Sequence, residues 1–278
     1  MFLLKQILPA AIIAMMVAAG VCGFALYWGK ERARHALGPL AIGLAYLSGH
    51  LLITGWVPFP PADTTNWLPH FALATAALGA SCGVLVIRTW ARALIFALVS
   101  VGALRVLLKP KFQYGWALGE GWLWVACLVC ALVLLAMIFD ALARRSPSAL
   151  EMPAFLLIVS AATSGALMLS GSMLLGQFAA VLAGAVFGTL VFALRRVNLG
   201  REIAPVFSLL LVALLLSGYF FAELPATSAA LLAFAPVLAL IPLRMRRRLA
   251  FPVRATLVSL PILVALVLAF RSSPPLIY

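Results

Sequence analysis

The chain has 278 residues, of which 65% are hydrophobic and only 10% carry a charge. Soluble domains carry about 25% charged residues, and a run of about 20 apolar residues is long enough to cross a bilayer as a helix. Such runs recur here from end to end, separated by short basic or proline-rich breaks. The composition excludes a soluble domain of useful size. It predicts an all-α, polytopic integral membrane protein with short loops, in which residues 1–278 form a single transmembrane domain.

The net charge of +13 would suggest nucleic-acid binding in a soluble protein. In this chain the basic residues lie in the short breaks between apolar runs, as they do in the cytoplasmic loops of membrane proteins. No break carries a motif that reads bases. We therefore expect the lipid bilayer to be the main partner, and we expect no nucleic acid partner.

About ten transmembrane helices are predicted. In chain order, the apolar runs lie near residues 7–28, 37–57, 67–87, 93–108, 119–139, 153–170, 173–194, 203–222, 227–243 and 252–270. The first run has about 22 residues, more than the apolar part of a typical signal peptide, so we expect it to be retained as a span. Pro236 and Pro261 fall inside the last two runs, where they should bend the helices.

The second and third runs form a predicted hairpin with a proline-rich tip, Pro58–Asn66. His50 and His70 lie in its two arms, both roughly 10 Å below the outer boundary at 1.5 Å per helical residue. Imidazoles at one depth predict either a shared site for a polar ligand, a proton or a haem, or separate hydrogen bonds to neighbouring helices. Asp63, in the tip, is expected to cap the third span, because aspartate accepts hydrogen bonds from the free amides at a helix start.

Arg105 lies near the outer end of the fourth run, and Glu120 lies at the mouth of the fifth. An ionisable residue inside a span is a candidate functional residue, and a guanidinium matches a carboxylate or a phosphate. Two other interpretations stay open: Arg105 extends to the outer headgroups, or it pairs with Glu120. Our hypothesis is a ligand-binding cavity open to the outer side, formed by His50, His70, Arg105, Glu120 and Asp63.

The lysines and arginines fall unevenly on the two sides of the predicted bundle. Of the 20 in the chain, fifteen lie in the breaks on one side and four lie on the other, while Arg105 lies within a span. Because cytoplasmic loops carry the excess of positive charge, this distribution predicts basic loops in the cytoplasm and both termini outside. The expected location is a bacterial inner (plasma) membrane.

Two glycine pairs have the spacing that lets transmembrane helices approach one another closely. They are Gly79 with Gly83 in the third run and Gly184 with Gly188 in the seventh. We expect other helices to pack on these two faces.

Several chemistries are absent from the sequence. All seven acids lie at span ends or in breaks, so no acid lies at mid-membrane, where many proton pumps use one. No Walker A, dinucleotide-binding, G-x-S-x-G or H-E-x-x-H motif occurs. The four cysteines lie inside apolar runs without the further ligands that a zinc site needs. We therefore expect no catalytic residue, no bound metal and no cofactor.

Three hypotheses for the function follow. The first is a solute permease or flippase with a polar pocket in the outer half of the membrane, acting on a small anionic solute. The alternative is a non-catalytic membrane subunit or scaffold that assembles with other membrane subunits in a larger complex. The third is a membrane enzyme that uses His50 and His70. Polar residues converging on one cavity would favour the first hypothesis, and a lipid-level apolar face without a cavity would favour the second.

Overall fold

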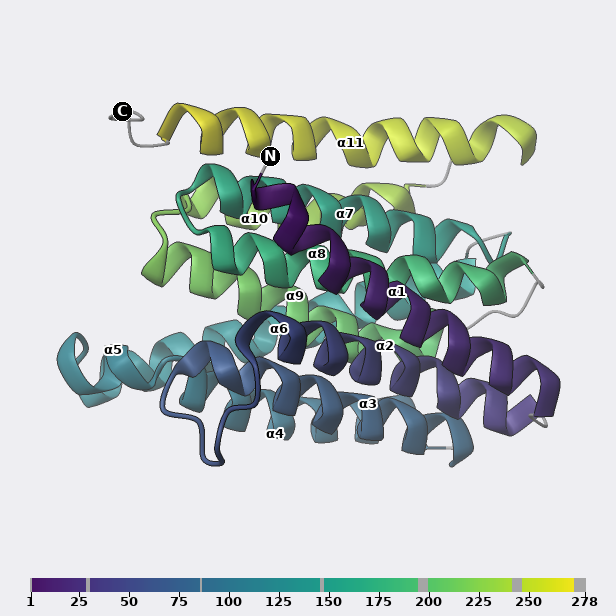
Figure 1. Ribbon diagram of the computed structural model, residues 1–278, viewed down its shortest axis with the longest axis horizontal. Coiled ribbons are helices and arrows are strands. Elements are labelled where there is room, and N and C mark those ends of the chain that lie inside the picture. Colours follow the sequence, from purple (N-terminus) through teal and green to yellow (C-terminus); the bar gives the residue numbers. More distant parts are fainter. Residues whose placement is uncertain are drawn as a thin grey trace.

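The structure, a computed structural model, describes residues 2–28, 31–85, 87–145, 148–194, 200–241 and 247–272. Within these ranges it is a bundle of helices without strands (Figure 1). In chain order the elements are α1 (Phe2–Trp28), α2 (Glu31–Thr54), the 3₁₀ helix η1 (Thr64–Trp67), α3 (Leu68–Val84), α4 (Thr89–Leu107), α5 (Lys109–Tyr114), α6 (Leu118–Arg145), α7 (Glu151–Leu169), α8 (Met173–Leu194), α9 (Gly200–Phe221), α10 (Ala226–Phe234), the 3₁₀ helix η2 (Ala235–Leu240) and α11 (Arg247–Ser272).

Among the described residues, nine helices are long and apolar enough to cross a membrane, namely α1, α2, α4, α6, α7, α8, α9, α11 and η1 continued by α3. The prediction of an all-α, polytopic membrane protein is therefore confirmed. The span expected near residues 227–243 is a shorter, broken segment in which α10 passes directly into η2. Pro236 lies in the first turn of η2, where its missing N–H interrupts the α-helical hydrogen bonds.

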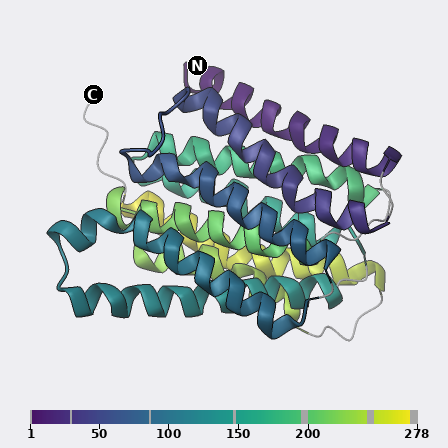
Figure 2. The ribbon, with the colours of Figure 1, turned by 90° about the horizontal axis from the view of Figure 1, so that it is seen from below.

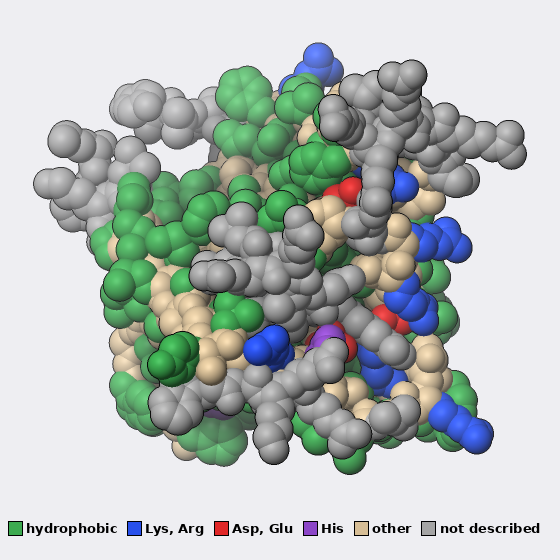
Figure 3. All heavy atoms as spheres, turned by 90° about the vertical axis from the view of Figure 1, so that its right-hand side faces the viewer, with side chains coloured by type: hydrophobic (Ala, Val, Ile, Leu, Met, Phe, Trp, Pro, Cys, Tyr) green, Lys and Arg blue, Asp and Glu red, His purple; other side chains and the backbone are tan. Residues whose placement is uncertain are grey.

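The helices run back and forth along one axis, so the connections between them gather at two ends of the bundle (Figure 1). The start of α1, the tip between α2 and α3, α5 and the end of α11 lie at one end, which we call the hairpin end. The opposite end, which we call the basic end, holds the connections rich in arginine. Figure 3 faces the basic end and shows Lys and Arg side chains there, with Asp, Glu and His side chains among them.

Helix α9 lies at the centre of the bundle. It packs against α2, α3, α4, α6, α7, α8 and α10, and it is the most buried of the spans, whereas α1 and α11 are the least buried. Figure 1 shows α11 along one edge of the bundle, and Figure 2 shows α1 along another. The two peripheral helices therefore present most of their surface to the surrounding lipid.

Glycines hold α1 close to α8, as their spacing predicted. A Cβ atom placed on Gly188 would lie 2.5 Å from the carbonyl oxygen of Met15, and one placed on Gly184 would meet the backbone of Ala11. On the buried side of α1, small side chains follow one another at helical spacing: Ala10, Ala14, Ala18, Cys22 and Ala25. Lipid removes the hydrophobic drive between helices, so close van der Waals packing of this kind is what holds them together.

The second glycine pair lets α3 approach two helices. A Cβ atom on Gly79 would lie 2.6 Å from the carbonyl oxygen of Glu202 in α9, and one on Gly83 would lie 2.9 Å from the carbonyl carbon of His35 in α2. These contacts bring the basic ends of α2, α3 and α9 together.

Several helices are longer than the predicted spans. Helix α2 begins at Glu31 rather than near residue 37 and ends at Thr54, so that Pro39 falls inside it. Helix α6 continues to Arg145 rather than ending near residue 139. Arginine and alanine are good helix formers, so these helices extend past the apolar core, whereas hydropathy marks only the core itself.

Candidate functional site

His50 is enclosed between α2 and α8. It is 1% exposed, and its ring stacks on that of Phe178 with 4.2 Å between the centroids. Neither ring nitrogen has a hydrogen-bond partner in the described structure, and the hydroxyl of Tyr46, one turn earlier on α2, is also buried without one. Separate hydrogen bonds to neighbouring helices are one of the two expected arrangements, and for His50 none meets hydrogen-bond geometry among the described residues. His50 lines none of the cavities described below.

His70 lies in an aromatic cluster beneath the tip of the hairpin. Its ring centroid is 5.5 Å from that of Trp67 and 5.6 Å from that of Phe59, and its Nδ1 atom is 3.3 Å from the carbonyl oxygen of Asn66. The side chain of Asn66 also approaches His50. The two histidines pack on different aromatic side chains, His50 on Phe178 and His70 on Trp67 and Phe59.

Asp63 does not cap the third span, so that prediction is wrong. Asp63 occupies the N-cap position of η1, but its side chain makes no capping hydrogen bond. Its backbone carbonyl instead accepts a hydrogen bond from the backbone N–H of Asn66 at 3.2 Å. Because the turn η1 comes between Asp63 and α3, the residue that precedes α3 is Trp67.

Arg105 packs on α5 rather than on an acid. Its guanidinium carbon lies 4.1 Å from the ring centroid of Phe112, an arrangement that stabilises a cation. Glu120 is exposed and forms no ion pair with Arg105 in the described structure, so that interpretation is wrong. Arg105 also contacts neither histidine. A cavity shared by His50, His70 and Arg105 stays a prediction.

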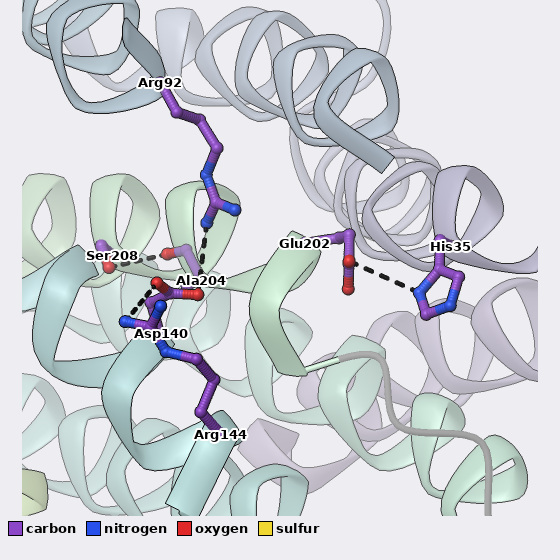
Figure 4. A network of polar contacts seen from close by, with 7 residues as sticks. All are labelled: His35, Arg92, Asp140, Arg144, Glu202, Ala204 and Ser208. Carbon is purple, nitrogen blue, oxygen red and sulfur yellow. Dashed lines mark hydrogen bonds and ion pairs between the residues drawn. The ribbon is translucent and has the colours of Figure 1, made fainter. Parts of the chain in front are cut away.

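The basic end contains buried ion pairs that we did not predict. Asp140 of α6 lies 3.7 Å from Arg92 of α4 and 2.9 Å from Arg144, one turn further along α6 (Figure 4). Glu202, at the start of α9, lies 3.4 Å from Nδ1 of His35 on α2. One pair connects α2 to the central helix α9, and the other connects α4 to α6. Both lie at the basic end of the bundle.

A third ion pair joins α7 to α11 at the same end. Arg254 donates a hydrogen bond from Nη1 to Oε2 of Glu151 at 3.1 Å, and the exposed fractions of the two side chains are 15% and 4%. The Nε atom of Arg254 is buried and has no acceptor among the described residues. The sequence carried a signal for these pairs, since each acid lies within one turn of a span end on the basic side.

An apolar groove opens between α6, α9 and α10. Its volume is about 290 Å³, and polar atoms are rare in its lining, where Trp124 and Tyr219 are the residues with a polar group. Helix α10 contributes small side chains to it: Ala226, Ala229, Ala230 and Ala233. A groove of this kind at membrane depth fits an extended apolar chain.

A second cavity, which we call the basic cavity, lies where α6, η2 and α11 meet. Its volume is about 400 Å³, and it is lined by Leu142 and Arg145 of α6, Ala239 and Leu240 of η2, and Arg254 of α11. A guanidinium group matches a carboxylate or a phosphate, so the basic cavity is a candidate site for an anion.

Both cavities open onto one face of α6. Their α6 residues recur at intervals of three, four or seven, which places them on the same side of the helix: Trp124, Leu128, Ala131, Leu135, Leu142 and Arg145. The stretch from the first to the last spans roughly 31 Å at 1.5 Å per residue, about the thickness of a bilayer core. Between the two cavities η2 packs against α6.

The sequence carried a partial signal for this arrangement. Pro236 in a short apolar run predicted a bend, and the bend is the break between α10 and η2. In the sequence, Arg145 and Arg254 stand out only as positive charges that set the orientation.

No protein-family model, no curated protein and no solved structure matches this chain. The class of protein therefore rests on the fold itself, which is that of a multi-pass helical membrane protein in contact with lipid.

Proposed function

We propose that the chain is a membrane carrier of the permease or flippase type, and that it moves an amphiphilic anion along the face of α6. The observation that carries this proposal is the broken segment, which lines the apolar groove with α10 and the basic cavity with η2. Irregular backbone at membrane depth is tolerated where it is buried or lines a cavity. Discontinuous helices of this kind form the substrate sites of many transporters.

The two linings match the two parts of an amphiphile. The apolar groove suits a hydrocarbon tail, and the basic cavity suits a charged group. The proposal keeps the anionic solute that we expected from the sequence. It places the charged group at the basic end, because Arg145 and Arg254 border a cavity whereas Arg105 packs on Phe112.

Passage between the cavities requires η2 to separate from α6. A 3₁₀ helix has poorer hydrogen-bond geometry than an α-helix, and Pro236 supplies no N–H, so this segment is suited to act as a hinge. The chain has no Walker A motif and no acid at mid-membrane. The proposed movement is therefore passive and runs in both directions.

The proposed orientation places the basic end in the cytoplasm, with the hairpin end and both termini outside. Fifteen basic residues on one side against four on the other support it. The proposed location is a bacterial inner membrane. In this orientation the basic cavity lies at the level of the cytoplasmic headgroups.

The proposal is tested by reconstituting the purified protein into vesicles that contain a fluorescent phospholipid in both leaflets. Dithionite, added outside, bleaches only the outer leaflet. We expect the protein to bring inner-leaflet lipid into reach, so that bleaching goes beyond that in protein-free vesicles. Identical bleaching with and without the protein, at equal vesicle integrity, would refute the carrier.

A second candidate function, a membrane subunit, is favoured by another groove. This groove has a volume of about 330 Å³ and opens between α1, α7 and α8, where small residues include Ala11, Ala161, Ala180, Ala183 and Gly184. Small residues let a transmembrane helix of a partner approach closely. If the chain is a subunit, the particle purified from native membranes should be heavier than the chain alone, and A161W should release the partner.

A further inference from the structure

We propose that the basic cavity binds the phosphate-bearing headgroup of an anionic lipid, whose acyl chain enters the apolar groove along α6. This inference rests on the proposed function and names its substrate class. The occupant follows from the charge of the cavity and from the apolar face that leads away from it.

The charge of the cavity is only partly neutralised within the protein. Arg145 is exposed and forms no ion pair with a described acid. Arg254 uses Nη1 on Glu151, while its Nε–H is buried and has no acceptor. An arginine has five N–H donors and no acceptor, so Arg254 has donors left for a second anion beside Glu151.

The geometry of these donors suits a phosphate. Guanidinium groups bind phosphate through paired, charge-assisted hydrogen bonds, which are stronger than those between neutral groups. Arg145 and Arg254 reach the cavity from different helices, α6 and α11. A phosphate in the cavity would accept hydrogen bonds from Arg145 and from the Nη donors of Arg254 that Glu151 does not use.

The neighbouring apolar groove distinguishes a lipid from a soluble anion. Leu142 lines the basic cavity and Leu135 lines the apolar groove, and the two are separated by roughly 10 Å along α6. An acyl chain extends further than that from its headgroup, because half of a bilayer core is about 15 Å thick. A lipid with its phosphate at Arg145 therefore has a tail long enough to enter the groove once η2 separates from α6, which a free phosphate does not have.

Arginines at the cytoplasmic level of membrane proteins also serve simply to set orientation. Such residues need no cavity, and their side chains extend along the protein surface toward the headgroups. Arg145 and Arg254 differ because they border a cavity of about 400 Å³ between three segments. Arg88, which is exposed at the same end and lines none of the cavities described above, provides the comparison.

The test measures binding of phosphatidylglycerol and of phosphatidylcholine to the purified protein by native mass spectrometry, with R145Q and R88Q as variants. Both lipids carry a phosphate, but the choline cation of phosphatidylcholine is repelled by the two guanidinium groups, so we expect phosphatidylglycerol to bind about tenfold more tightly. R145Q should lose that preference, and R88Q should keep it. Melting temperatures without added lipid confirm that both variants are folded.

In a parallel experiment, inorganic phosphate or glycerol 3-phosphate is added as a soluble competitor of the bound lipid. If either displaces phosphatidylglycerol at an equal concentration, the occupant is a soluble anion and the proposal is overturned. Equal binding of the two lipids, or an equal loss in R145Q and R88Q, overturns it as well.

The two proposals fail separately. Arg145-dependent binding without lipid movement in vesicles would refute the carrier and leave the headgroup site standing. Lipid movement that is the same for both lipids and unchanged in R145Q would refute the headgroup site and leave the carrier standing.

Discussion

Replacing Gly188 with alanine should loosen α1 from α8. The added methyl group would lie 2.5 Å from the carbonyl oxygen of Met15, 2.6 Å from Cβ of Ala18 and 3.0 Å from the backbone nitrogen of Ala19. None of these atoms can rotate away, so the helix itself must move. Overpacking of this kind costs about 1–3 kcal/mol. A loss of about 2 kcal/mol lowers the melting temperature by roughly 4–8 °C in a chain of this size.

The assay follows the monodisperse peak in size exclusion after heating in detergent, with Gly23→Ala as the matched control. Gly23 is also in a helix of this pair, and a Cβ atom there would meet nothing within 4 Å. Alanine is the better helix former by about 1 kcal/mol, so the control should be as stable as the wild type or more so. Equal melting temperatures for Gly188→Ala and the wild type, or an equal drop in both variants, would show that the close approach of α1 to α8 does not stabilise the bundle.

Three further outcomes are expected. Asp140→Ala should destabilise the protein by about 3 kcal/mol in denaturant titrations, because it removes the buried carboxylate that Arg92 faces. Arg144→Ala, at an exposed partner, should cost less than about 1 kcal/mol, and similar losses in both variants would contradict the burial of the network. Reporter fusions after Ser148 and after Ala62 should read inside and outside respectively, and the same reading for both would refute the orientation. His50→Phe should leave the melting temperature unchanged or raise it, because it replaces two unpartnered ring nitrogens with apolar atoms; a fall of several degrees would show that the imidazole has a partner.

The class of the fold could be predicted because lipid allows few alternatives, whereas about ten spans were expected and nine helices of spanning length are described. A spanning backbone must satisfy its own hydrogen bonds, so each long apolar run becomes a helix. The run near residues 227–243 was the exception in form: Pro236 predicted a bend, and the segment breaks into α10 and η2. Whether a proline bends a helix or breaks it depends on which backbone hydrogen bonds form beside it. Those hydrogen bonds depend in turn on how the neighbouring helices pack.

The depth of a residue could be predicted, but not its surroundings. Counting along the helices places His50 and His70 at similar depths on adjacent arms, and α2 and α3 pack against each other. Counting residues along a helix does not show in which direction a side chain points around the helix axis. The ring that covers His50 belongs to Phe178 of α8, far along the chain, so its burial could not be anticipated.

For the acids at the basic end, too, the sequence predicts the position along the helix but not the contacts of the side chain. Asp140 and Glu202 lie at span ends, where an exposed side chain in contact with water was the natural expectation. Their burial depends on Arg92 and His35, which come from other helices. Pairing between helices is a property of the packed bundle, and the sequence pattern shows only that both partners lie on the same side of the membrane.

The most direct test of the carrier compares two tryptophan variants in the dithionite assay. Ala230 is exposed in the groove beside α6, and Ala161 is exposed in the groove between α1, α7 and α8. A tryptophan fills part of either groove without disturbing a buried contact. The carrier predicts that Ala230→Trp abolishes the protein-dependent bleaching of inner-leaflet lipid while Ala161→Trp retains it. Undiminished bleaching in Ala230→Trp, or loss only in Ala161→Trp, would contradict passage along α6.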